Sequence, residues 1–194
     1  MHTDATASPC LKSGVISVFI TNLGKYNEGE LVGEWLELPV TLEEVQHCLA
    51  RIGIDGTHYE EYFLTDYESS IDGVSSYISE YSVLDELNAL ATKLTELSCD
   101  EIYLYQAVIE MGGYVSSIDD LIHLIDNLDS FQRLDDVNNE YDLGYYWIEE
   151  SGCYDVEQFG CLSHYFDYER YGRDIYLEQG GIFCGGGYVY HTGG

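Results

Sequence analysis

Residues 15–38, VISVFITNLGKYNEGELVGEWLEL, decide how the chain begins to fold. Five of the six residues over 15–20 are β-branched or aromatic, which predicts a buried strand. Residues 22–24, Asn-Leu-Gly, predict a turn, because Asn and Gly favour turn conformations. A second strand is expected over residues 31–38. Together these segments indicate the start of a small sheet.

The next stretch adds a helix and a third strand. Residues 41–44, Thr-Leu-Glu-Glu, match a capping box, in which the Thr hydroxyl accepts a hydrogen bond from the first helical turn. This helix is predicted to run to about Arg51, and a third strand is predicted over residues 59–64. Residues 15–77 are therefore expected to form a small α+β domain. Residues 1–14 are expected to be a disordered extension of it.

The middle of the chain, residues 78–126, is predicted to be helical. Ser82 precedes leucines at helical spacing, Asp100 opens a second apolar-periodic stretch, and Ser117 precedes a third. The residues expected to face the core are Leu84, Leu87, Leu90, Ala91 and Leu94 in the first helix, Ile102, Tyr105, Ala107 and Ile109 in the second, and Leu121, Ile122, Leu124, Ile125 and Leu128 in the third.

The last third, residues 127–194, mixes both element types. Helices are predicted over residues 139–151 and 158–171. Short strands joined by glycine turns are predicted over residues 175–177, 182–184 and 188–190. The predicted fold class is therefore α+β, with a small α+β N-terminal domain, a helical middle domain and a mixed α+β C-terminal domain.

The composition predicts a folded protein with an unusually negative surface. The chain has 194 residues, with 36 Asp and Glu against 7 Lys and Arg, and its formal net charge is -29. Disordered acidic chains lack the aromatic residues needed to offset their ordering entropy. Here 45% of the residues are apolar and 14% are aromatic. These side chains are sufficient to build hydrophobic cores despite the repulsion between surface charges.

The distribution of charge limits the partners that this protein can bind. The net charge is -10 over residues 1–77, -9 over residues 78–126 and -10 over residues 127–194, whereas an acidic tail would concentrate it. The few basic residues are scattered, which argues against nucleic-acid binding. An anionic membrane would repel the chain as well. The expected partners are cations or proteins with basic surfaces.

The chain shows no sequence feature of an exported or membrane protein. No stretch approaches the roughly 18 apolar residues of a membrane span, and residues 15–20 are too short for a signal-peptide core. The predicted location is the cytoplasm. The cysteines are widely spaced and form no CxxC pair, which argues against a zinc knuckle. Reduced thiols are expected there, and disulfides remain an alternative for a secreted protein.

No motif points to catalysis. Adjacent carboxylates recur throughout a chain this acidic, so their presence does not indicate a glycosidase pair. The histidines show neither HxxxH nor HExxH spacing, and Cys161 with His164 lacks a third, orienting group. Gly185-Gly186-Gly187 opens no helix, so it predicts a turn and not a phosphate cradle. The protein is predicted not to be an enzyme and to need neither metal nor cofactor.

The candidate binding site is the acidic surface itself. Many of its acids fall in first helical turns, where the helix dipole favours negative charge, so local stabilisation is an alternative role for them. The candidate residues are Glu43, Glu44, Asp66, Glu68, Asp85, Glu86, Asp100, Glu101, Glu110, Asp119, Asp120, Asp135, Asp136, Glu149, Glu150, Asp155, Glu157, Asp167, Glu169 and Asp174.

Several blocks of the sequence resemble the ArdA antirestriction family. They occur in the order found in that family and extend over roughly residues 15–184. The blocks are NLGKYNEGELVGEW at residues 22–35, EEY at 60–62 followed by DYE at 66–68, LNALA at 87–91, and YFDYERYGRD at 165–174. The first block is long and is the most specific of them.

The resemblance implies an elongated three-domain protein whose curved acidic surface imitates bent B-form DNA. The implied targets are type I restriction–modification enzymes, bound at the methyltransferase core with its specificity subunit. The resemblance also implies a homodimer formed through the C-terminal domain. We expect Tyr145, Trp147 and Ile148 at that interface, although these residues could equally belong to the domain core.

The charge alone is consistent with DNA mimicry. B-form DNA has one charge per about 1.7 Å of axis, so 29 charges correspond to roughly 50 Å of duplex, or about 15 base pairs. The main alternative is an acidic adaptor or chaperone for one basic protein. Competition with DNA distinguishes the two, because an adaptor need not block a DNA groove.

Overall fold

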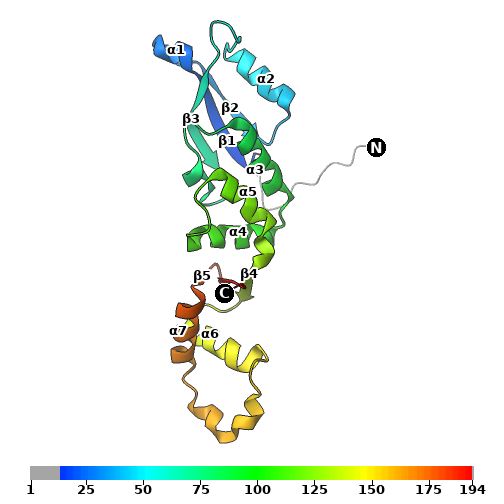
Figure 1. Ribbon diagram of the computed structural model, residues 1–194, viewed down its shortest axis with the longest axis vertical. Coiled ribbons are helices and arrows are strands. Elements are labelled where there is room, and N and C mark those ends of the chain that lie inside the picture. The colour runs from blue at the N-terminus through cyan, green and yellow to red at the C-terminus, as the bar shows by residue number, and fades with distance from the viewer. Residues whose placement is uncertain (1–13, 194) are drawn as a thin grey trace, which may run out of the picture. The chain divides into compact units, whose positions relative to one another are not determined.

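A computed structural model describes residues 14–193, so the expected disordered extension lies, apart from Gly14, outside the described residues. The fold is mixed α+β (Figure 1), as predicted. The chain divides into two compact units. The first comprises the chain up to Ile102 together with Gly113–Asp126, and the second comprises Tyr103–Gly112 with the chain from Asn127 onward.

The first unit contains an antiparallel sheet of order β2-β1-β3. Its strands are β1 (Ile16–Asn22), β2 (Gly33–Leu38) and β3 (Tyr62–Ser69). The first two confirm the prediction. The third begins at Tyr62 and not at Tyr59, because the Asp55 carboxylate accepts hydrogen bonds from the backbone N–H groups of Thr57, His58 and Tyr59 at 2.8–3.1 Å. These bonds hold residues 55–59 in a loop ahead of the strand.

The predicted turn at residues 22–24 is a short helix, α1 (Leu23–Asn27). Asn22 is fully buried and caps it, since its side-chain oxygen accepts a hydrogen bond from the Lys25 N–H at 3.0 Å. The Asn22 amide also donates to the Ile52 carbonyl at 3.1 Å. One polar side chain therefore joins the end of β1 to the end of the next helix.

That next helix, α2 (Leu42–Arg51), confirms the prediction, and the Thr41 hydroxyl accepts from the Glu44 N–H at 3.2 Å. It buries Val45 and Cys48. Alternate residues of β1 are buried on one face of the sheet. Together with apolar residues of the neighbouring strands they form a hydrophobic core. The strand residues of this core are Ile16, Val18, Ile20, Leu36, Leu38 and Leu64.

The helical prediction for the middle region holds, with one error in capping. The region contains η1 (Val74–Tyr77), α3 (Leu84–Glu96), α4 (Cys99–Met111) and α5 (Ile118–Asp126). Ser82 is not the cap of α3, because its hydroxyl accepts a hydrogen bond from the Ser79 N–H at 2.9 Å. Asn88 fixes α3 instead. Its side chain bonds both the N–H and the carbonyl of Val40, at 2.8 and 3.0 Å.

The apolar residues predicted for these helices are largely buried. Leu84, Leu87, Leu90, Ala91 and Leu94 of α3 are all buried, as are Ile102, Tyr105, Ala107 and Ile109 of α4. In and after α5, Leu121, Leu124 and Leu128 are buried, whereas Ile122 and Ile125 are half-buried. Helical periodicity therefore identified the core side of each helix.

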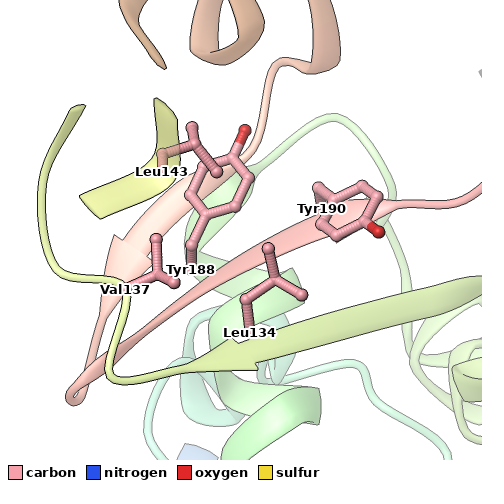
Figure 2. Close-up of a cluster of buried hydrophobic side chains, with 5 residues drawn as sticks. All are labelled: Leu134, Val137, Leu143, Tyr188 and Tyr190. Carbon is pink, nitrogen blue, oxygen red and sulfur yellow. The ribbon is translucent and has the colours of Figure 1, made fainter. Parts of the chain in front are cut away.

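The second unit is built on an antiparallel sheet of order β4-β6-β5. Its elements include η2 (Leu128–Ser130), β4 (Phe131–Asp135), β5 (Ile182–Cys184) and β6 (Gly187–His191). The last two strands confirm the prediction, whereas β4 was not predicted. Figure 2 shows the core that covers this sheet, formed by Leu134, Val137, Leu143, Tyr188 and Tyr190.

The helices of this unit correct two further predictions. The predicted helix over 139–151 is present as α6 (Glu140–Tyr145) continued by η3 (Tyr146–Glu150). The predicted single helix over 158–171 is present only in part: η4 (Val156–Tyr165), a 3-10 helix, is interrupted at Gly160, where φ is 53°, and α7 (Tyr168–Gln179) starts as a separate helix after an Asp167 cap. The predicted strand over 175–177 is wrong, because those residues lie within α7.

Two glycines allow α7 to pack closely on α6. A Cβ at Gly172 would collide with the Glu140 carbonyl oxygen, and a Cβ at Gly144 would collide with the Tyr168 carbonyl oxygen. Both glycines are buried. The two backbones therefore approach more closely than any larger residue permits.

The cysteine prediction holds only in part. Cys48, Cys153, Cys161 and Cys184 are free thiols, whereas Cys99 is disulfide-bonded. The expectation of reduced thiols is therefore wrong at Cys99. Cys10 lies outside the described residues.

Gly172→Ala tests the helix contact. We expect it to lower the free energy of unfolding by about 1–3 kcal/mol or more, because the added methyl overpacks a backbone-to-backbone contact. Thermal unfolding followed by circular dichroism measures the change. Glu178→Ala, at an exposed position of the same helix, is the control and should change stability by less than about 0.5 kcal/mol. Equal stability of both variants would contradict this account of α6–α7 packing.

Candidate acidic interaction surface

The acidic surface consists of side chains that all reach solvent. Among the described residues no Asp or Glu is buried, and the buried polar residues are Thr21 and Asn22. The predicted site acids are exposed except for Glu44, Asp120 and Glu149, which are half-buried. Solvation explains this placement, because an unpaired carboxylate in an apolar core is strongly unfavourable.

Four helices place acidic pairs in their first turns, as the sequence predicted. The pairs are Glu43 and Glu44 in α2, Asp85 and Glu86 in α3, Asp100 and Glu101 in α4, and Asp119 and Asp120 in α5. The free N–H groups of a helix N-terminus favour these negative charges. The helix starts therefore determine where part of the surface charge is located.

Two of these acids have a defined local role. Glu101 accepts hydrogen bonds from the N–H and hydroxyl of Ser98 at 2.8 and 2.7 Å. Asp120 accepts from the N–H and hydroxyl of Ser116 at 2.9 and 2.6 Å. These bonds to the ionised form lower the pKa of each carboxyl below its ordinary value. Both acids therefore stabilise their helices and stay charged at neutral pH.

The remaining predicted acids are distributed over both units. Asp66 and Glu68 lie on β3 of the first unit, and Glu110 lies near the end of α4, in the part of that helix that belongs to the second unit. The other predicted acids of the second unit lie at the end of β4, in η3, at η4 and in α7. They are Asp135, Asp136, Glu149, Glu150, Asp155, Glu157, Asp167, Glu169 and Asp174.

Some acids of the second unit have intramolecular partners. Asp135 pairs with Arg133 at 3.0 Å, and Asp155 accepts from the Gln158 amide at 2.6 Å. Glu149 accepts a 2.5 Å hydrogen bond from the Tyr168 hydroxyl, which raises the pKa of that tyrosine to about 12. Asp167 caps α7 through the Arg170 N–H at 3.0 Å. Acids without such bonds are better probes of partner binding.

The basic side chains are largely neutralised within the protein. Arg51 binds Glu34 at 2.8 Å and Glu44 at 3.1 Å, and these bonds raise the pKa of its guanidinium. Arg173 pairs with Glu140 at 3.0 Å, and Lys93 pairs with Asp126. The pairs are exposed and each contributes only about 0–1 kcal/mol. Their main effect is to mask positive charge, and the sequence did not identify the partner acids Glu34, Asp126 and Glu140.

The residues predicted for a dimer interface lie in different environments. Tyr145 is exposed and stacks on Tyr141, with ring centroids 6.4 Å apart. Trp147 is half-buried and packs against the core, with its ring 6.3 Å from that of Tyr190. Ile148 is half-buried. Of the three, Tyr145 is the one best placed to meet another molecule.

The part of the chain that the structure describes contains no cluster of His, Cys, Asp or Glu arranged to hold a metal ion. An open pocket of about 600 Å³ in the second unit is lined by Glu140, Glu169 and the stacked rings of Tyr176 and Phe183. Within residues 14–193 no helix is long and apolar enough to span a membrane.

Comparison with known protein families identifies a relationship. The family model described as antirestriction protein (ArdA) matches residues 18–190. No curated protein matches the chain. The matched range includes nearly all of both compact units and every predicted site acid.

Proposed function

The chain belongs to the ArdA family of antirestriction proteins, and we propose that it inhibits type I restriction–modification enzymes by occupying their DNA-binding groove as an acidic mimic of bent B-form DNA. Family membership makes it an inhibitor of restriction–modification enzymes and not an enzyme itself. The proposed contact is with the methyltransferase core and its specificity subunit, in the cytoplasm.

The observation that supports mimicry is the solvent placement of the charge. No carboxylate among the described residues is buried, and Arg51, Lys93, Arg133 and Arg173 are paired with carboxylates of the same chain. A groove that binds DNA contacts phosphates mainly through Arg and Lys, without reading the bases. A surface of closely spaced carboxylates can satisfy those residues and offers no base edges. The protein should therefore inhibit enzymes that recognise different DNA sequences.

The proposal uses charge along the whole chain. The net charge differs by at most one between the three predicted domains. These are residues 15–77, 78–126 and 127–194, and the charge of the N-terminal extension is counted with the first. Many contacts of low individual energy are expected from such a surface. This differs from an enzyme, in which loss of one carboxylate typically abolishes activity.

The first prediction of this proposal is competitive inhibition that weakens with salt. Binding to a basic groove exchanges counterions, so the affinity should fall steeply as the salt concentration rises. The measurement is displacement of a labelled duplex from a type I methyltransferase at several salt concentrations. Inhibition that is independent of both DNA and salt concentration would indicate a site outside the DNA groove.

The second prediction concerns single carboxylates. Glu43→Gln, Asp85→Asn and Glu150→Gln each remove one exposed charge from a different predicted domain. Each should weaken inhibition by less than about fivefold, because one exposed charge contributes only about 0–1 kcal/mol. The triple variant should weaken it progressively. Inhibitor affinity is measured for each variant, and circular dichroism confirms the fold.

The choice of positions follows from the structure. Asp120→Asn and Glu44→Gln would also remove a helix cap or an ion pair, so their effects would mix stability with binding. They are therefore less informative than Glu43 and Asp85. Complete loss of inhibition in one well-folded single variant would refute distributed mimicry and indicate a discrete site.

We also propose that the protein is a homodimer formed through residues 127–194. Tyr145 is exposed, so Tyr145→Ser should weaken association without unfolding the chain. Trp147 packs against the core and is unsuitable for this test. Light scattering across a concentration range measures the oligomeric state. A monomer at every micromolar concentration would show that the proposal is wrong.

A further inference from the structure

The sheet of the first unit, of order β2-β1-β3, has one face that is not part of the core described above. Ile16, Val18 and Ile20 are buried on the core face of β1. Successive side chains of a strand point to opposite faces, so Phe19 lies on the other one. In register, Phe19 is opposite Trp35 of β2 and Asp66 of β3. We call this second face the outer face of the sheet.

Aromatic rings gather on the outer face. The Phe19 and Trp35 rings meet edge to face with centroids 5.5 Å apart. Phe19 also lies over Gly33, where it occupies the space that a Cβ would need. Phe63, opposite Thr21 on the same face, meets Tyr26 at 5.2 Å. The contacts fix these rings, yet Trp35 remains 45% exposed and Tyr26 remains 51% exposed.

Carboxylates flank these rings. Ser17 is opposite Glu37 of β2 and Glu68 of β3, which places both acids on the outer face, and Asp66 lies beside Phe19. All three acids are exposed. The intramolecular ion pairs of the described chain do not involve them. Their charge is therefore directed at solvent and at any approaching partner.

Fixed aromatic rings beside carboxylates match the chemistry of Arg and Lys side chains. A guanidinium or ammonium group is attracted to the face of Trp or Tyr, and Arg can stack on the ring while it hydrogen-bonds a carboxylate. The first unit already contains one such contact, because the Lys25 ammonium lies over the Tyr59 ring at 5.7 Å from its centroid.

We propose that the outer face, formed by Phe19, Trp35, Glu37, Phe63, Asp66 and Glu68, docks Arg or Lys side chains of the inhibited enzyme's DNA-binding groove. This inference rests on the proposed function and adds to it. The exposed edges of a DNA backbone present phosphates but no aromatic faces. The outer face would therefore supply binding energy that DNA lacks and that salt screens only weakly.

Trp35→Ala tests this docking face. We expect it to weaken binding to a type I methyltransferase by about 2- to 30-fold, the range for loss of a cation–π contact from exposed to desolvated sites. The slope of log affinity against log salt should stay unchanged, because a neutral side chain releases no counterions. Trp35→Phe should retain part of the affinity. Tyr81→Ala, at an 82% exposed aromatic residue outside the outer face, is the matched control and should bind as the unaltered protein does.

Glu37→Gln provides the complementary measurement. It should reduce the salt slope, because one fewer charge faces the groove. Circular dichroism and thermal unfolding must first show that every variant folds. If Trp35→Ala binds the methyltransferase with unchanged affinity, the outer face does not dock the enzyme, whatever the oligomeric state of the variant. The proposed function would still stand if the unaltered protein competes with DNA. Failure of the unaltered protein to compete with DNA would overturn the proposed function itself.

Discussion

Repulsion among carboxylates is the constraint on which the rest of this structure depends. A formal charge of -29 on 194 residues opposes any compact state. The fold places every described acid where water can solvate it, and it places acidic pairs at the starts of α2, α3, α4 and α5, where helix dipoles favour them. The helix starts stabilise these negative charges, and the carboxylates in turn stabilise the helix starts, as the Ser98–Glu101 and Ser116–Asp120 hydrogen bonds illustrate.

The cores must offset this repulsion without adding charge, and tyrosine suits that purpose. Its ring buries a large apolar area, and its phenol is neutral at neutral pH. Tyr188 and Tyr190 lie in the core of the second unit, where burial raises the pKa of Tyr188 to about 12. Tyr105 is likewise buried in α4, so these tyrosines supply apolar bulk to the cores without adding charge. Close contact of α6 with α7 at Gly144 and Gly172 adds further packing.

The same arrangement connects stability with the proposed function. Because Arg51, Lys93, Arg133 and Arg173 are bound to carboxylates of the same chain, little positive charge remains to interrupt the acidic surface. The ion pairs contribute little to folding, yet they preserve the uniform sign of the surface. The aromatic rings of the outer face differ from this pattern. They lie beside Glu37, Asp66 and Glu68 and add an apolar contact to an otherwise electrostatic surface.

The sequence by itself determined the elements whose signals are local. The run of β-branched and aromatic residues in β1, the Thr41 cap of α2, and the apolar periodicity of α4 and α5 depend on neighbouring residues, and composition required the carboxylates to be exposed. Only the tertiary structure decided the elements set by distant contacts. The short strand β4 exists because it pairs with β6 far along the chain. Residues 175–177 include Ile and Tyr, which favour strands, yet they lie within α7, which packs closely on α6 at Gly172. The rings of the outer face meet because strand register brings Phe19 opposite Trp35. Register and packing depend on residues that are distant in sequence, so no local pattern reports them.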